Sequence, residues 1–205
     1  YIDHSQLEAG IHFLAPAVLQ YSANGENMHQ IANRELHAVP HGCYRCKGDD
    51  RWCAIAVFTD GEWQSFCRVL GTPSWTMDPS LATIIGRKEN EGRIDSLLEE
   101  WTIQFTPEEV SEKMQNAGIA AGVVSTGEDL SNNPQLTARN FYQKLVHPET
   151  GPVPFSNPPF KLSKSSVEVR KAATCLGEHT EYICREILGI SDDEFIDIFS
   201  SGAFD

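Results

Sequence analysis

The sequence predicts an α/β protein with a small α+β domain at its centre. Between about residues 41 and 125, short apolar segments of strand type flank three patterns with helical spacing. Apolar residues make up 40% of the 205 residues and charged residues 22%, which is ordinary globular usage. This composition excludes disordered and fibrous classes, and the length is sufficient to bury a core.

The charge balance excludes one class of partner. Sixteen Lys and Arg against 29 Asp and Glu give a net charge of −13, and the basic residues are scattered, so we expect no nucleic acid partner.

The longest apolar stretch, residues 119–124, is far too short for a bilayer, so we expect no membrane partner. Six Cys without a signal-peptide pattern predict reduced thiols in a soluble, cytoplasmic protein.

A helix is predicted at the beginning of the chain. Residues 5–8 read Ser-Gln-Leu-Glu, a capping box, and apolar residues recur with helical spacing as far as Leu19. Pro16 should kink this helix or end its first segment. Because Tyr1 is not a start Met and a strong helix signal follows at once, we expect a fragment of a longer protein, with residues 1–40 as a helix and connecting segment.

The central domain, 41–125, is expected to begin with a hairpin. Residues 43–47 and 52–58 form its strands, and the continuous apolar run of the second predicts burial on both faces. Asp60 is expected to cap a helix over 61–70 that buries Trp63, Phe66, Cys67 and Leu70.

Two more helices and a strand complete this domain. An amphipathic helix is predicted to begin near Asn90, and Thr106-Pro-Glu-Glu is a second capping box. The helix that follows this box should end at Gly118, before a strand over 119–124.

Residues 126–205 are predicted to contain short elements joined by a Pro-rich connection. We expect a short helix within 130–140, a strand over 141–147, and an extended connection over 148–159, which holds five Pro. A helix over 178–188 and another that begins at Ser191 should close the chain. The second of these is expected to bury Phe195, Ile198 and Phe199.

No metal site is predicted from the cysteines. Cys43 and Cys46 have the spacing of a metal knuckle, with His41 two residues earlier, but a second pair of ligands is missing. Their odd separation in a strand should also place the two thiols on opposite faces.

The sequence offers few candidates for catalytic residues. His37 and His41 are expected to lie together in a loop, where they could act as acid, base or substrate clamp. Nucleophile elbows and phosphate-binding glycine loops are missing from the sequence, and the carboxylate pairs are explained by helix termini and solvated faces. From residue patterns alone we therefore assign no catalytic residue.

Taken as a whole, the chain resembles the C-terminal half of a family III CoA-transferase, the formyl-CoA and carnitine-CoA transferase family. The resemblance consists of seven short segments in the family's order and extends over nearly all of the chain. They are Tyr-Ile-Asp-His-Ser-Gln-Leu-Glu-Ala (1–9), Ala-Asn-Arg (32–34) with Pro-His-Gly-Cys-Tyr-Arg-Cys-Lys (40–47), Asp-Gly-Glu-Trp (60–63), Asp-Pro (78–79), Gly-Ile-Ala-Ala-Gly-Val-Val (118–124), Phe-Ser-Asn-Pro-Pro-Phe-Lys-Leu-Ser (155–163) and Leu-Gly-Glu-His-Thr (176–180).

The resemblance implies transfer of CoA from an acyl-CoA to a free carboxylic acid, through a covalent intermediate on an Asp that lies upstream of this chain. It implies an interlocked homodimer, with residues 126–205 returning to the large domain. Coenzyme A is then a substrate of the full-length enzyme, and this fragment alone should bind no cofactor and be inactive. Asn33, Arg34, His37 and His41 are the expected substrate-binding residues.

The chain departs from the family at one informative place. Formyl-type and oxalyl-type members carry a glycine run between the Asn and the Pro of this passage, whereas residues 35–38 here read Glu-Leu-His-Ala. Side chains there remove backbone freedom. We therefore expect an acid bulkier than oxalate or formate.

Two other functions remain open at this point. An α-methylacyl-CoA racemase has the same fold, and its acid and base would also lie upstream of this chain. A non-catalytic protein-interaction domain would instead use the Pro-rich connection and the acidic surface.

Overall fold

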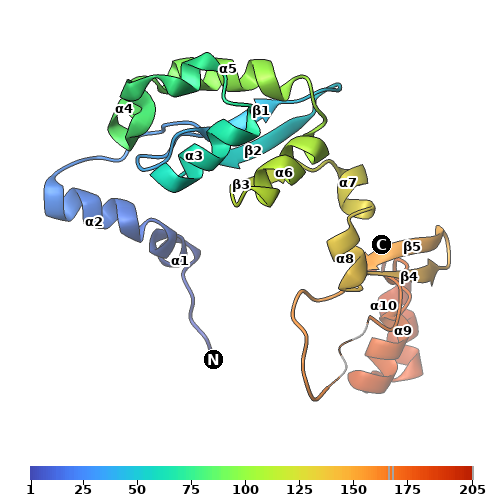
Figure 1. Cartoon of the computed structure of the whole chain (residues 1–205). Helices are drawn as coiled ribbons and strands as arrows, with labels where there is room; N and C mark the ends of the chain where they lie inside the picture. The colour runs from blue at the N-terminus through green and yellow to red at the C-terminus, as the bar shows by residue number, and fades with distance from the viewer. Residues whose placement is uncertain (166, 168, 205) are drawn as a thin grey trace. The chain divides into compact units, whose positions relative to one another are not determined.

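The computed structural model describes residues 1–165, 167 and 169–204. The chain forms two compact units, Tyr1–Val124 and Ser125–Asp205 (Figure 1). Each unit contains both helices and strands, which confirms the predicted α/β class.

The first unit contains a three-stranded antiparallel sheet in the order β1-β2-β3. Its strands are β1 (His41–Arg45), β2 (Trp52–Ala56) and β3 (Ala120–Val123). The α-helices of the unit are α1 (Gln6–Phe13), α2 (Ala15–Asn24), α3 (Asp60–Val69), α4 (Ile84–Glu89), α5 (Glu91–Thr102) and α6 (Pro107–Asn116), and two 3₁₀ turns are η1 (Ser74–Met77) and η2 (Pro79–Ala82).

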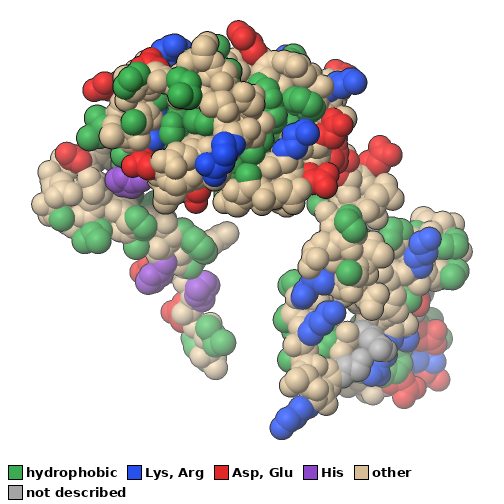
Figure 2. Space-filling model, in the orientation of Figure 1, with side chains coloured by type: hydrophobic (Ala, Val, Ile, Leu, Met, Phe, Trp, Pro, Cys, Tyr) green, Lys and Arg blue, Asp and Glu red, His purple; other side chains and the backbone are tan. Residues whose placement is uncertain are grey.

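Helices α1 and α2 form where one broken helix was predicted. The Ser5 hydroxyl accepts a hydrogen bond from the Glu8 amide, as expected for the cap. Pro16 lies in the first turn of α2, where its missing N–H costs little, so the predicted break is confirmed. Neither helix buries a residue. Their apolar side chains lie on the surface, as the green atoms of Figure 2 show.

The core of the first unit lies on one face of the sheet. Strands β1 and β2 send Tyr44, Cys53 and Ile55 to this face. Helices α3, α5 and α6, seen beside the strands in Figure 1, cover it. Their core side chains are Trp63, Phe66, Cys67, Ile94, Leu98, Val110 and Met114.

The hairpin departs from the prediction in one respect. The prediction that β2 is buried on both faces is wrong, because only alternate residues are buried and Ala54 and Ala56 lie on a partly open face. Alanine is apolar but small, so the run looks continuous in the sequence although one side faces a hollow.

The prediction of Asp60 as the N-cap of α3 is also wrong. Thr59 is the N-cap and forms a capping box with Glu62, while Asp60 is the first helical residue. The second predicted box, Thr106 with Glu109, is confirmed at α6, and the predicted start of α5 near Asn90 is confirmed by a helix that begins at Glu91.

Residues 74–89 lie between α3 and α5, and 3₁₀ turns form where the sequence, with Pro73 and Pro79, predicts a loop over 72–80. Helix α4 contributes Arg87, whose side chain is fully buried. Its guanidinium donates to Asp60 Oδ1 at 2.7 Å and to the carbonyls of Leu81 and Ala82 at 3.2 and 3.3 Å. It also lies over the Trp63 ring, so one cation connects three segments.

The second unit contains a two-stranded sheet with short helices. Strands β4 (Tyr142–His147) and β5 (Gly151–Ser156) pair antiparallel. The helices are α7 (Gly127–Ser131), α8 (Pro134–Ala138), α9 (Thr180–Tyr182), a π-helical turn η3 (Ile183–Ile187) and α10 (Asp192–Ser200).

Two predictions for this unit are corrected. The Pro-rich connection contains strand β5, because Pro152 and Pro154 alternate along it and a two-stranded sheet leaves one edge of each strand unpaired. Helix α10 buries none of its residues. Phe195 and Phe199 instead contact each other, with ring centroids 6.2 Å apart, and Phe199 is 64% exposed.

Candidate functional site

The site begins with the face of the three-stranded sheet that the helices do not cover. The strand register aligns Cys43 with Ala54 and Gly122 across the three strands, and His41 with Ala56 and Ala120. These side chains are small except at the His41 end. The sheet therefore presents a shallow floor on which another molecule can approach the backbone closely.

An open cleft of about 580 Å³ lies over this floor. The segment before β1 supplies its polar wall through Asn33 and Arg34. Among the described residues that line it, Arg34 is the one cation, and none is Asp or Glu. The lining residues are Ala32, Asn33, Arg34, His41, Gly42, Cys43, Ala54, Ile55, Ala56, Ala120, Ala121 and Gly122.

The wall is attached to the sheet at both ends. The His41 imidazole bonds through Nδ1 to the Asn33 carbonyl, and the Val39 amide donates to the Val57 carbonyl at 3.0 Å. The Val57 amide donates in turn to the Pro40 carbonyl at 2.9 Å. Residues 38–40 are buried, so this end belongs to the core of the unit.

The tautomer of His41 follows from this contact. A carbonyl oxygen only accepts, so Nδ1 must carry the proton, and in neutral His41 the Nε2 atom is the acceptor. The ring lies edge-on to Phe58, with centroids 6.1 Å apart. The imidazole is thereby held in one orientation at the border of the cleft.

Arg34 is held by a carboxylate of helix α5. Its Nε atom lies 3.6 Å from Glu91 Oε2, and its side chain remains 55% exposed. The same carboxylate also binds Lys88 Nζ, at 3.0 and 3.1 Å from its two oxygens. One carboxylate therefore orients two cations beside the wall.

A smaller hollow of about 260 Å³ lies on the α5 side of the same wall. It is lined by Arg34 and His41 and also by Asp95 and Glu99. Asp95 accepts a hydrogen bond of 2.8 Å from the Tyr44 hydroxyl. Burial, with a smaller contribution from the charge of Glu91, raises the pKa of Asp95 above its ordinary value of 3.8.

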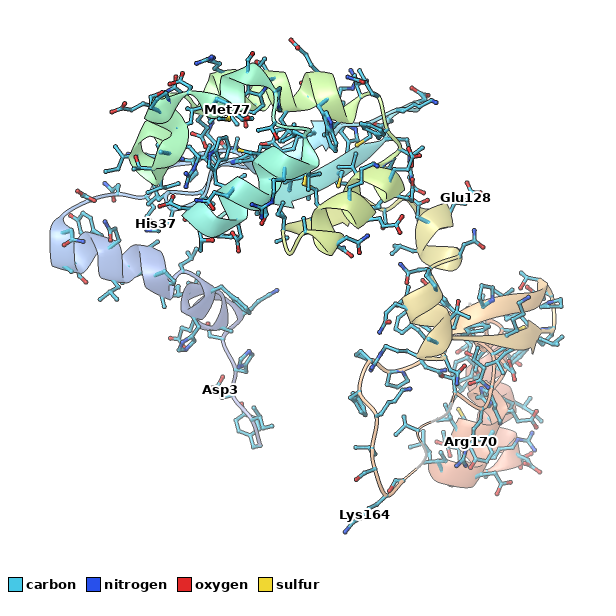
Figure 3. All side chains as sticks on the ribbon, in the orientation of Figure 1. Asp3, His37, Met77, Glu128, Lys164 and Arg170 are labelled. Atoms are coloured by element: carbon cyan, nitrogen blue, oxygen red, sulfur yellow. The ribbon has the colours of Figure 1, made fainter. Side chains whose placement is uncertain are left out.

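The structure brings three of the four predicted site residues together. Asn33, Arg34 and His41 line both hollows. His37 is exposed on the segment between α2 and β1, where Figure 3 labels it, and does not line either hollow. His41 lies in strand β1, so the expectation that the two imidazoles share a loop is corrected.

The cysteines separate as predicted for a strand. Cys43 is exposed at the cleft and Cys46 is buried on the opposite face. Burial raises the pKa of the Cys46 thiol to about 11 and that of Cys53 to about 12. Across the described part of the chain no group of three or more His, Cys, Asp or Glu could hold a metal ion. Nor does any helix there have the length and apolar character to cross a membrane.

Lys88, Glu91 and Asp95 are the residues that sequence reasoning missed. Glu91 and Asp95 are four residues apart on one face of α5, a spacing visible in the sequence. Nothing in the sequence indicates that this face meets the segment around residue 34, which precedes it by more than fifty positions.

A family model and curated relatives of this chain point to the same enzyme family. A family model described as CoA-transferase family III matches residues 1–180. A probable CoA-transferase of Mycobacterium tuberculosis is 30% identical over 203 residues, which are 95% of this chain and 24% of the relative. A formyl-CoA:oxalate CoA-transferase of Rhodopseudomonas palustris is 30% identical over 98% of this chain and 45% of its own length. The chain thus spans less than half of these curated relatives.

Solved structures agree with the family model. A CAIB/BAIF family protein from Brucella suis superimposes with a TM-score of 0.74 at 25% identity, over 86% of this chain and 45% of that one. A Mycobacterium tuberculosis protein at 15% identity, with a TM-score of 0.66 over 88% of this chain and 46% of its own, shows the same fold. With a matching family model over most of its length, this chain belongs to CoA-transferase family III.

Proposed function

We propose that this chain forms the acid-binding side of the active site in an enzyme that moves CoA from an acyl-CoA to a free carboxylic acid. Membership of the family supports the reaction class. The observation that carries the proposal is the cleft, with one cation, one imidazole and one amide beside a floor of Ala and Gly. A carboxylate is best bound by a guanidinium, and an apolar acyl group by such a floor.

Each polar residue then has a distinct part. The Arg34 guanidinium pairs with the substrate carboxylate through its terminal nitrogens, while Glu91 contacts it at Nε. His41, held through Nδ1, offers Nε2 to the substrate, as an acceptor when neutral and as a donor when protonated. The Asn33 side-chain amide supplies both a donor and an acceptor.

The nucleophile is proposed to lie outside this chain. An Asp carboxylate there attacks the thioester carbonyl, so that the C–S bond breaks and a mixed anhydride forms with release of the CoA thiolate. The thiolate then attacks the Asp carbonyl, which frees the donor acid and leaves an enzyme-bound CoA thioester. The acceptor carboxylate repeats the two steps in reverse order. CoA enters as substrate, and no further cofactor is needed.

A second copy of the enzyme is the proposed partner of α1 and α2. Both helices bury none of their residues, and they and the residue between them expose apolar side chains by 58–88%, namely Leu7, Phe13, Leu14 and Leu19. An apolar surface of this kind is typical of a subunit or domain interface. We propose that it packs within a homodimer of interlocked chains.

The acid is proposed to be larger than oxalate or formate. Relatives at 30% identity are named formyl-CoA:oxalate CoA-transferases, and one at 23% is a succinyl-CoA–D-citramalate CoA-transferase of Chloroflexus aurantiacus. In this chain residues 35–38 follow the wall residues Asn33 and Arg34, do not line the cleft themselves, and carry side chains throughout. Side chains in place of a glycine run restrict the backbone beside the cleft, which supports an acid other than oxalate or formate.

The test is a steady-state assay of the full-length enzyme with an acyl-CoA donor and oxalate, succinate or citramalate as acceptor. Arg34→Gln should raise the KM for the acid tenfold or more, since a charged hydrogen bond is worth about 1.5–3 kcal/mol. Lys47→Met, which removes a cation on the hairpin turn outside the cleft lining, is the matched control. Equal acid KM values for the two variants would contradict the proposal. Exchange of the α-proton of a 2-methylacyl-CoA without any acceptor acid would instead indicate the racemase.

A further inference from the structure

We propose that Lys88 and Glu91 are positioning residues that hold the loop 33–38, whose residues Asn33 and Arg34 form the polar wall of the cleft, and aim Arg34 at the acid. The inference rests on the proposed function, because Arg34 is assigned there to the substrate carboxylate. It adds two residues that lie outside the lining of the main cleft.

Lys88 is the central tether of the loop. Its Nζ atom donates to the Glu35 carbonyl at 2.7 Å and to the two Glu91 oxygens at 3.0 and 3.1 Å. An ammonium has three N–H donors, so all three are used in these contacts. The Glu35 carbonyl belongs to the middle of the loop, between the two attached ends.

Glu91 is fixed independently of the loop. It is the first residue of α5, where a carboxylate is favoured by the helix dipole, and its side chain is only 8% exposed. From there it contacts both Lys88 and Arg34. Because one carboxylate contacts two cations, the three groups carry a net charge of +1, which favours binding of a substrate anion at Arg34.

The neighbouring acid does not compete for Arg34 at close range. Asp95 is occupied by the Tyr44 hydroxyl at 2.8 Å, and its surroundings disfavour the charged form. The assignment of Glu91 as the partner of Arg34 therefore stands on contact geometry and burial together.

Loss of Lys88 should loosen the loop without unfolding the sheet. The two ends are held by other contacts, at Asn33 through His41 and at Val39 through Val57. Release of the Glu35 carbonyl then affects only the residues between them. The expected effect is local mobility of the wall and a less well placed Arg34.

The experiment compares Lys88→Met, Lys88→Arg and Glu91→Gln with the Lys47→Met control, all in the full-length enzyme. Lys88→Met should raise the KM for the acid about tenfold, with a much smaller change in kcat, as expected when a charged hydrogen bond that orders the site is lost. Lys88→Arg should recover most of the affinity because it keeps the charge and the donors. Glu91→Gln should raise the acid KM in the same direction.

Hydrogen exchange on the same proteins separates positioning from general stability. In Lys88→Met the amides of 34–38 should exchange about tenfold faster, while those of β2 and α5 stay as in the control. An unchanged acid KM together with unchanged exchange would overturn the inference. Faster exchange throughout the unit would also overturn it, since that result indicates a purely structural role. Should the unsubstituted enzyme transfer no CoA, the proposed function fails, whereas loop-confined exchange in Lys88→Met would still support the tether.

Discussion

Gly86 in helix α4 lies so close to the backbone of the turn η2 that no side chain fits there. A Cβ atom built there would lie 1.7 Å from the Ser80 carbonyl oxygen, far inside the 3.0 Å below which real contacts of this kind essentially do not occur. The obstacle is backbone of the turn η2, so it cannot rotate away as a side chain could. Gly86→Ala must therefore separate α4 from η2.

The cost can be estimated from what this separation disturbs. Overpacking a well-packed site costs about 1–3 kcal/mol. The same movement strains the contacts of buried Arg87 with the carbonyls of Leu81 and Ala82. The better helix propensity of Ala returns about 1 kcal/mol. With the upper end of the overpacking range, because the obstacle is backbone, we expect a net loss of about 2 kcal/mol in the free energy of unfolding. Because the next two residues include Lys88, the loop tether should weaken as well.

Gly92→Ala is the matched control. Gly92 also lies in a helix, α5, but a Cβ atom added there would meet no atom within 4 Å apart from its chain neighbours and the backbone of its own helix, so Ala should stabilise the unit by about 0.5–1 kcal/mol. All four Trp belong to the first unit. Urea unfolding followed by Trp fluorescence therefore reports on this unit alone. A Gly86→Ala protein as stable as the unsubstituted chain would refute the packing argument.

Three other predictions concern Asp95, the cysteines and the cap of α6. Asp95→Asn keeps an acceptor for Tyr44 but removes a half-buried carboxylate whose pKa is raised, so it should increase the urea midpoint at pH 7. That gain should shrink as the pH is lowered through the raised pKa of Asp95, where the carboxyl becomes protonated; a gain that does not change with pH would contradict the assignment. Iodoacetamide should label Cys43 in the native chain much faster than Cys46 or Cys53, as peptide mass spectrometry can measure, and equal rates would argue against their burial. Thr106→Ala removes the cap of α6 and should cost about 1 kcal/mol in the same urea assay, with Thr106→Ser recovering most of it.

Local signals in the sequence were sufficient for most helices and strands. The break at Pro16, the box at Thr106 and the end at Gly118 each depend on residues within one turn, and the structure confirms them. Thr59 was overlooked in favour of Asp60 because both are good caps and only the hydrogen bonds distinguish them.

Tertiary contacts account for what the sequence could not predict. Arg87 and Lys88 are adjacent in α4, yet one is fully buried against Asp60 while the other reaches the Glu35 carbonyl. A strand buried on both faces was inferred from an apolar run whose Ala residues in fact form the floor of a hollow. Arg34 and His41 were recognised through resemblance, whereas Glu91, which holds Arg34, belongs to no local motif.

We propose that this chain binds the acid while the reactive carboxylate lies elsewhere in the enzyme. This proposal is tested by comparing CoA transfer from an acyl-CoA to succinate by the 205-residue polypeptide and by the full-length enzyme, at equal concentration. We expect turnover for the full-length enzyme alone. Sustained transfer by the isolated polypeptide would refute the proposal, because the nucleophile would then have to be one of its own residues.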